Sequence, residues 1–202
     1  MKNLVNKIVF KRAINFFLFA VTITIIAAIA TYIINPDLKE TIRGLGNRTP
    51  DQVRESAGLD KVWSYIVNNG LKVPLQMFIL ALIPIQFLYV INVILTVSLP
   101  GILFGIVLQA DLNTGLGIII SVVPHYIFEV FAFCLFAAIL FELNKAIRIK
   151  VKSIFKKEKI GISLNKKFFE TIKIYVVLTL PIIIVAAFLE TYIADIIFDL
   201  FR

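Results

Sequence analysis

Apolar residues form long runs along this chain, and charged residues are confined to short islands between the runs. Three runs cover about residues 13–34, 116–143 and 174–200, and a fourth extends over residues 71–109. A helix needs about 20 mainly apolar residues to cross a bilayer, because each residue adds about 1.5 Å and the hydrocarbon core is about 30 Å thick. The pattern therefore predicts an all-α polytopic membrane protein.

The run at residues 71–109 contains one charged residue, Lys72, and is too long for a single crossing. As one straight helix at about 1.5 Å per residue, it would reach almost twice the thickness of the hydrocarbon core. A break at its turn-forming residues predicts two spans, about 73–92 and 93–109, joined by a tight hairpin. The residues expected at the break are Asn92, Ser98, Pro100 and Gly101.

Two other runs each allow two interpretations. Residues 13–34 form either a retained span or a secretory signal peptide, and their length favours a span, because the apolar part of a signal peptide has roughly 7–15 residues. Pro124 divides residues 116–143, so either one kinked helix crosses here or residues 116–123 enter only partway. With two spans in residues 71–109, we expect five spans in a single membrane domain.

Small and polar residues inside the runs indicate expected helix contacts. Gly101 and Gly105 form a G-x-x-x-G pattern, which lets two helices approach closely but also arises by chance. Asn92 is expected either to form a hydrogen bond between helices or to lie in the hairpin turn.

The uneven distribution of lysine and arginine predicts the orientation. Four basic and no acidic residues precede residue 13, and ten basic against two acidic residues lie in the segment 144–173. Cytoplasmic loops carry an excess of Lys and Arg, so both segments are expected inside. This requires an even number of crossings between them, which four spans satisfy. The prediction is a multi-pass protein of the plasma membrane with a cytoplasmic N-terminus and an extracytoplasmic C-terminus.

The segment at residues 35–70 is nearly balanced in charge and is expected outside. Residues 49–52, "TPDQ", are typical of a helix start. Residues 59–70 have an amphipathic pattern that includes Trp63 and Tyr65, and such aromatic residues are frequent at the membrane–water boundary. This predicts a short amphipathic helix that either lies on the bilayer surface or packs under a small outer cap.

The segment 144–173 interleaves basic and apolar residues and is expected to be a cytoplasmic loop. Such segments lie against anionic headgroups, with about 1 kcal/mol of attraction for each basic residue near the surface. Orientation alone would account for many of these charges. The net charge of +8 follows this distribution, so we expect no nucleic-acid partner. The residues expected to contact anionic lipid are Lys145, Arg148, Lys150, Lys152, Lys156 and Lys157.

Three ionisable residues, His125, Glu129 and Glu190, lie inside apolar runs. A charge at mid-membrane costs about 2.5–3.5 kcal/mol on insertion scales, so such residues usually face the protein interior. His125 and Glu129 share a helix face, and the expected spans place His125 and Glu190 each about 12 Å deep. We expect one polar cluster. It is either a structural clasp, a site for a proton, an ion or a lipid headgroup, or a contact with a partner's membrane helix.

The motifs of common enzyme classes are missing from this sequence. His125 is the only histidine, whereas zincins need two in H-E-x-x-H. Neither Ser98 nor Ser121 lies in a G-x-S-x-G setting, and no phosphate-binding loop occurs. The single cysteine, Cys134, forms no intrachain disulfide and makes no metal site alone. We therefore expect a protein that is not an enzyme and that has no cofactor and no metal.

Two short stretches carry a resemblance to a known family. In "VVPHYIFEVFAF", Pro124, His125 and Glu129 match a signature on one membrane helix, and residues 186–190, "AAFLE", match a later element that ends in Glu190. On these residues the chain resembles the stage II sporulation protein M family, over about residues 63–195. Asn68, Asn69 and Asn92 also resemble family asparagines. Tyr126 departs from the family pattern, which usually has glycine there, and so do residues 130–132.

The resemblance implies a membrane anchor or scaffold for cell-wall-degrading enzymes during engulfment. Relatives also occur in organisms that do not sporulate, and some resemble the membrane subunits of ABC-type exporters, which implies an ATPase partner. The leading hypothesis is a non-enzymatic protein that recruits envelope-acting partners through its spans and its outer segment. The alternative is a transporter component in which the polar cluster lines a path or a lipid-binding cavity. Both leave a homo-oligomer open.

Overall fold

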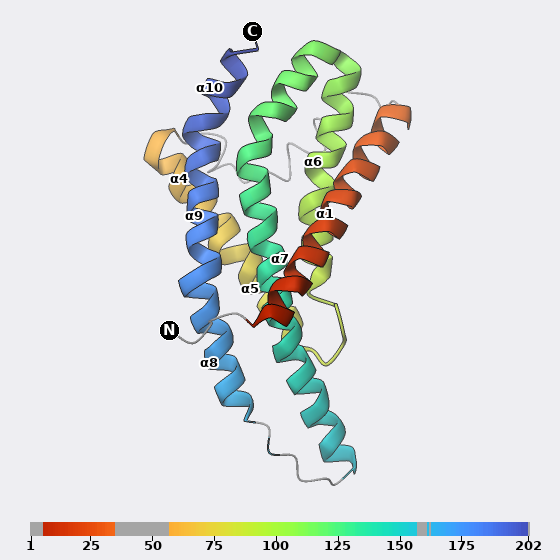
Figure 1. The fold of residues 1–202 in the computed structure, drawn as a ribbon, viewed down its shortest axis with the longest axis vertical. Coiled ribbons are helices and arrows are strands. Elements are labelled where there is room, and N and C mark those ends of the chain that lie inside the picture. The colour runs from red at the N-terminus through yellow and green to blue at the C-terminus, as the bar shows by residue number, and fades with distance from the viewer. Residues whose placement is uncertain (1–5, 35–56, 157–160, 162, 202) are drawn as a thin grey trace.

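The computed structural model describes residues 6–34, 57–156, 161 and 163–201, and the regular elements in these residues are all helical. The longer helices run roughly along the long axis of the molecule (Figure 1). Four helices are long and apolar enough to cross a membrane. The predicted all-α polytopic membrane fold is therefore confirmed.

These four helices are the framework of the molecule. Three of them are single elements, α1 (Lys7–Ile34), α6 (Val90–Ala110) and α7 (Leu112–Lys156). The fourth covers Leu164–Asp199 and contains two π-helical turns, named η2 and η3. Its segments are α8 (Leu164–Ile174), η2 (Tyr175–Thr179), α9 (Leu180–Phe188), η3 (Leu189–Ile193) and α10 (Ala194–Asp199).

A fifth helical stretch precedes α6, and its limits correct the expected hairpin. It consists of α4 (Gly58–Val67), the π-helical turn η1 (Asn68–Lys72) and α5 (Val73–Leu82), which follow one another without interruption. The chain then bends at residues 83–89, and α6 continues through Asn92 and Pro100. The expected break at residues 92–101 is therefore wrong, and so are the span limits 73–92 and 93–109.

Pro84 explains the actual position of the bend. A proline disfavours helical geometry in the residue before it, and Ile83 is extended, with φ −73° and ψ 130°. Asn144 of α7 then stabilises the bend, because its side-chain amide donates hydrogen bonds to the carbonyl oxygens of Ala81 (2.9 Å) and Ile83 (2.7 Å). Pro100 does not end α6, since membrane helices tolerate proline where neighbouring groups compensate for the lost hydrogen bond.

The expected surface helix at residues 59–70 is also different in the structure. It is the first part of the continuous α4–η1–α5 stretch and does not stop at Gly70. Gly70 lies in η1 and packs against α9, where a Cβ would come within 3.0 Å of Leu180 Cδ1. The hydroxyl of Tyr175 donates a hydrogen bond to its carbonyl oxygen. The expected helix start at residues 49–52 lies outside the described residues.

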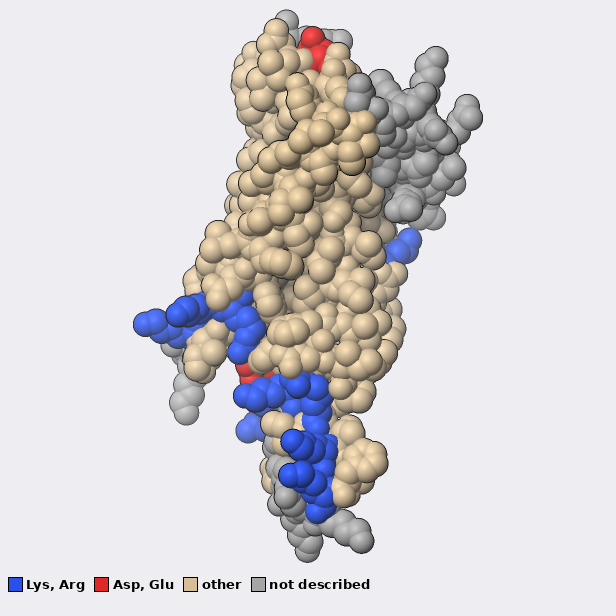
Figure 2. Space-filling model, turned by 90° about the vertical axis from the view of Figure 1, so that its right-hand side faces the viewer, with Lys and Arg blue, Asp and Glu red and all other residues tan. Residues whose placement is uncertain are grey.

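The helix α7 is one continuous element of 45 residues. It passes through Pro124, so the alternative in which residues 116–123 enter separately is wrong. At about 1.5 Å per residue it is about 67 Å long, which exceeds a hydrocarbon core of about 30 Å. Its basic part extends beyond the other helices, and lysine and arginine gather toward that end of the molecule (Figure 2).

Much of the expected basic loop at residues 144–173 is helical. The helix α7 continues to Lys156 and α8 begins at Leu164, because lysine and arginine favour helix and the first glycine comes only at Gly161. Lys145, Lys152 and Lys156 are exposed. Arg148 and Lys150 are partly buried, and Nε of Arg148 donates to Oδ1 of Asn144 at 3.0 Å. Lys157 lies outside the described residues.

The G-x-x-x-G pattern of α6 faces α1. A Cβ at Gly101 would lie 2.5 Å from the carbonyl oxygen of Thr24, and a Cβ at Gly105 would lie 2.5 Å from that of Ala28. The Thr24 hydroxyl also donates to the carbonyl oxygen of Val97, at 3.0 Å. The two glycines therefore let the backbones of α1 and α6 come into contact.

Candidate functional site

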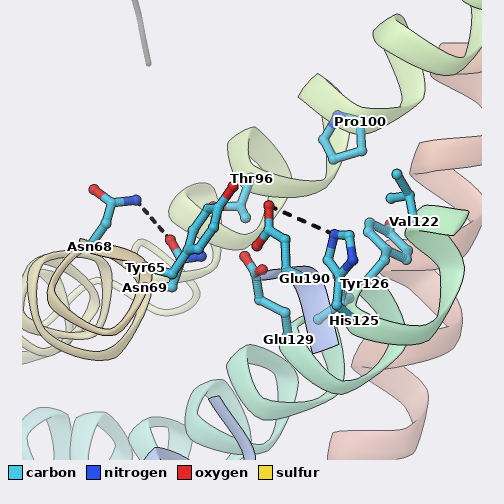
Figure 3. Close-up of a pocket in the computed structure, with 11 residues that line it drawn as sticks. Tyr65, Asn68, Asn69, Thr96, Pro100, Val122, His125, Tyr126, Glu129 and Glu190 are labelled. Atoms are coloured by element: carbon cyan, nitrogen blue, oxygen red, sulfur yellow. Dashed lines mark hydrogen bonds and ion pairs between the residues drawn. The ribbon is translucent and has the colours of Figure 1, made fainter. Parts of the chain in front are cut away.

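Polar side chains from several helices meet at a cavity of about 210 Å³ inside the bundle (Figure 3). The walls come from the α4–η1 stretch, α6, α7 and η3. The three ionisable residues predicted from the sequence all lie on these walls. The polar side chains that line the cavity are Tyr65, Asn68, Asn69, Thr96, His125, Tyr126, Glu129 and Glu190.

The structure brings His125 of α7 and Glu190 of η3 together. Nε2 of His125 lies 3.9 Å from Oε1 of Glu190, and the two side chains are 10% and 22% exposed. Glu129 lies one helical turn after His125 and points into the same cavity (Figure 3). Nδ1 of His125 is buried and makes no hydrogen bond with the part of the chain that the structure describes.

The α4–η1 stretch supplies the groups that face the two carboxylates. The Tyr65 hydroxyl lies within hydrogen-bonding reach of Glu190, and the Asn69 side chain lies within reach of Glu129. Nδ2 of Asn68 donates to Oδ1 of Asn69 at 2.7 Å. This bond occupies the amide oxygen of Asn69, so that its NH₂ group is available to the Glu129 carboxylate.

Tyr65 is partly buried and lines the cavity. Its expected position at the membrane–water boundary stays a prediction. Lys61, Tyr65 and Asn68 follow at helical spacing and share one face of the α4–η1 stretch, so this face turns toward the site. Lys61 interacts electrostatically with both His125 and Glu190. Trp63 is on another face and is 64% exposed, as suits contact with lipid.

Two of the π-helical turns contribute directly to the cavity. Asn68 and Asn69 belong to η1, and Glu190 belongs to η3. A π-helical turn shifts the register of the residues that follow it and often occurs at functional sites. The one signal in the sequence that could have pointed to η1 is the pair of asparagines inside an otherwise apolar stretch.

The side of the cavity toward α1 is closed by α6 and Tyr126. Thr96 and Pro100 of α6 line the cavity, and proline at position 100 cannot donate a backbone hydrogen bond to Thr96. The Tyr126 hydroxyl is hydrogen-bonded to the Thr24 hydroxyl of α1. Tyr126 thus ties α7 to α1 at the position where the family usually has glycine.

The remaining residues singled out in the sequence lie outside the cavity. Asn92 lies in the first turn of α6, where its Nδ2 donates to Oε1 of Gln76 at 3.5 Å, so it connects α6 with α5. Cys134 is fully buried in the core. Among the described residues, no group of three His, Cys, Asp or Glu side chains is arranged to hold a metal ion.

The chemistry of the cavity follows from its two acids. Carboxylates accept hydrogen bonds and attract positive charge, and both effects are stronger away from water. The aromatic faces of Tyr65 and Tyr126 nearby also favour cations. The arrangement therefore suits the binding of a small, positively charged or hydrogen-bond-donating group.

Comparison with known protein families gives a match over most of the chain. The sequence model described as "Stage II sporulation protein M" matches residues 13–195, which include every residue of the cavity wall. No curated protein matches the chain significantly. No solved structure matches it significantly either.

Proposed function

The chain belongs to the stage II sporulation protein M family, and on that premise we propose that it recruits and positions partner proteins in the cytoplasmic membrane without catalysing a reaction. The partner contact that we propose is at the cavity. A membrane helix of the partner would place a lysine or arginine side chain between Glu129 and Glu190. The segment between α1 and α4 would add contacts on the extracytoplasmic side.

The observation that carries this proposal is the pair of acids in one cavity. Within the described ranges, neither carboxylate forms an ion pair with a lysine or arginine: the 3.9 Å contact of Glu190 is with His125, and Lys61 acts on Glu190 only from beyond ion-pair distance. Two acids inside a membrane bundle are costly unless a positive group neutralises them. A basic side chain from a partner would supply that group. Binding would then be favoured, because it would recover the free energy that the acids cost the protein while they lack a counter-charge.

The proposed orientation follows from the arrangement of the helix ends. The turn at residues 83–89 lies at the same end of the molecule as the start of α1, and the α6–α7 connection lies near the C-terminus at the opposite end (Figure 1). With the basic residues inside, the N-terminus would be cytoplasmic and the C-terminus extracytoplasmic. The α4–η1–α5 stretch would then be a fifth crossing.

Cysteine labelling tests this orientation. In a Cys134→Ser background, which removes the only cysteine, we expect Ile85→Cys to react with a membrane-impermeant thiol reagent only in inverted vesicles. Leu112→Cys should react only in intact cells. Ile85 and Leu112 are matched in exposure, at 56% and 58%. Reaction of both cysteines from the same side would contradict five crossings.

Photo-crosslinking tests the partner contact. A photoreactive amino acid at Val122, which lines the cavity, should capture a membrane protein in native membranes. Mass spectrometry should find the crosslink in an apolar segment that contains a lysine or arginine. Ile120 lies on the same helix, is 42% exposed and is not part of the cavity wall, so it is the matched control. Equal capture at both positions, or a captured segment without a basic residue, would exclude the proposed contact.

A second candidate function is a transporter component with an ATPase partner. The observation that favours it is the volume of the cavity, about 210 Å³, which lies beside two acids and a histidine. Such a site could take a cationic substrate or a lipid headgroup. A neighbouring ATPase gene would favour transport, whereas neighbouring genes for wall-degrading enzymes would favour recruitment.

A further inference from the structure

A second, apolar groove of about 440 Å³ lies between the η1–α5 stretch and the α8–η2 stretch. Both α5 and α8 pack on α7, and Phe136 of α7 lies at the bottom between them. Leu71 and Leu75 line one side, and Ile172 and Tyr175 line the other. The groove is separate from the polar cavity, and its interpretation rests on the proposed orientation but not on the proposed partner contact.

Both ends of the groove are closed by contacts between its two sides. At one end the Tyr175 hydroxyl donates a hydrogen bond to the carbonyl oxygen of Gly70. Toward the basic end, the rings of Phe78 and Phe168 meet edge to face with their centroids 5.2 Å apart. Gly70 and Phe78 are about 12 Å apart along the helix, at about 1.5 Å per residue. A groove this short does not accommodate a helix, which is about 10 Å wide and would extend past both closures.

Several lysines lie next to residues of the groove in the sequence. Lys72 directly follows the lining residue Leu71, and Lys173 directly follows Ile172. Lys166 and Lys167 directly precede Phe168 at the end nearest the basic part of α7. One acid, Glu170, lies among them and pairs with Lys167 at 3.1 Å. The residues next to the groove lining in the sequence therefore carry an excess of positive charge.

We infer that the groove binds one anionic phospholipid of the inner leaflet, with an acyl chain between α5 and α8 and the phosphate beside the lysines. The lining suits an acyl chain, because the hydroxyl of Thr171, its buried polar residue, is already bonded to the carbonyl oxygen of Lys167 at 2.9 Å. Each lysine near an anionic headgroup contributes about 1 kcal/mol of attraction. A bound lipid would also fill the space that separates α5 from α8.

Lipid retention measures this binding directly. The full chain is reconstituted with an equal mixture of phosphatidylglycerol and phosphatidylcholine, extracted in mild detergent and analysed by native mass spectrometry. We expect one phosphatidylglycerol per chain to be retained, in about tenfold preference over phosphatidylcholine, which corresponds to about 1.4 kcal/mol. Retention of both lipids in equal amounts, or of neither, would overturn the inference.

Two pairs of variants locate the site. Leu75→Trp fills the groove and should lower phosphatidylglycerol retention about tenfold, whereas Ile79→Trp should not. Ile79 lies one turn further along α5, with an exposure of 54% against 58% for Leu75, and does not line the groove. An unchanged melting temperature in phosphatidylcholine would show that Leu75→Trp folds. Equal retention by the two tryptophan variants would place the lipid elsewhere.

The second pair tests the headgroup contact. The triple change of Lys166, Lys167 and Lys173 to glutamine should abolish the preference for phosphatidylglycerol. The matched control changes three exposed lysines of α7 to glutamine, which alters the net charge equally. These lysines are expected to contact anionic lipid at the bilayer surface and not in the groove, so the preference of the one retained lipid should be preserved. If both triple variants lose the preference, the basic surface as a whole attracts the lipid and the inference is wrong. The control residues are Lys145, Lys152 and Lys156.

Discussion

Replacing Glu129 and Glu190 together with glutamine should abolish capture of the partner while leaving the protein at least as stable as the wild type. Glutamine keeps the size and most of the hydrogen bonds of glutamate but removes the charge. A charged side chain inside the membrane costs on the order of 2.5–3.5 kcal/mol on insertion scales, and glutamine cannot carry that charge. The same change deprives a basic partner side chain of both counter-charges, and loss of one member of a buried charge pair costs about 2–5 kcal/mol of binding.

Two measurements decide the outcome for the double variant. The yield of the crosslink through position 122 should fall at least about tenfold, since about 1.4 kcal/mol already corresponds to that factor. The melting temperature in detergent should stay the same or rise. Glu170→Gln, a change at an exposed acid on α8, is the control and should alter neither quantity. A clear fall in melting temperature for both single variants would instead identify the acids as a structural clasp.

Leucine at Gly105 should destabilise the protein by about 3 kcal/mol, near the upper end of the usual cost of overpacking. The added Cβ would lie 2.5 Å from the carbonyl oxygen of Ala28 and 2.7 Å from Cβ of Thr31, and neither atom is the flexible end of a side chain. The helix α1 would have to move away from α6. That movement would also strain the hydrogen bond from Thr24 to Val97.

Thermal unfolding in detergent measures this effect. Gly101→Leu should behave in the same way, because its Cβ would lie 2.5 Å from the carbonyl oxygen of Thr24. Gly161→Leu is the matched control, since a Cβ there meets no atom within 4 Å. A melting temperature equal to that of the control would mean that α1 and α6 do not pack closely through these glycines.

The fold could be predicted from the sequence as far as local patterns reach. The apolar runs indicated membrane helices, because placing a charged residue in lipid is costly. That cost applies to each residue by itself, so it can be read from the sequence. The position of the bend could not be predicted, because both Pro84 and Pro100 lie in the same apolar run. Pro84 ends its helix where Asn144, distant in sequence, bonds to the exposed carbonyl oxygens. Pro100 remains inside a helix that packs against neighbours.

The candidate site could also be predicted from the sequence only in part. His125 and Glu129 share a face because of their helical spacing, and an estimate of depth was enough to associate Glu190 with them. Tyr65 and Asn69 were not expected there. Their placement depends on a helix that continues through η1, and the π-helical turn changes the direction of the residues around it.

The sequence by itself determined that this protein is a helical membrane protein of its family with acids and a histidine inside the bundle, because these features depend on composition, on residue spacing along single helices and on a local signature. Only the tertiary structure decided where the chain turns, that Tyr65 and Asn69 face the two acids, and that a groove remains between α5 and α8. These features depend on which helices touch and in what register, and that is set by packing and hydrogen bonds between residues far apart in the chain.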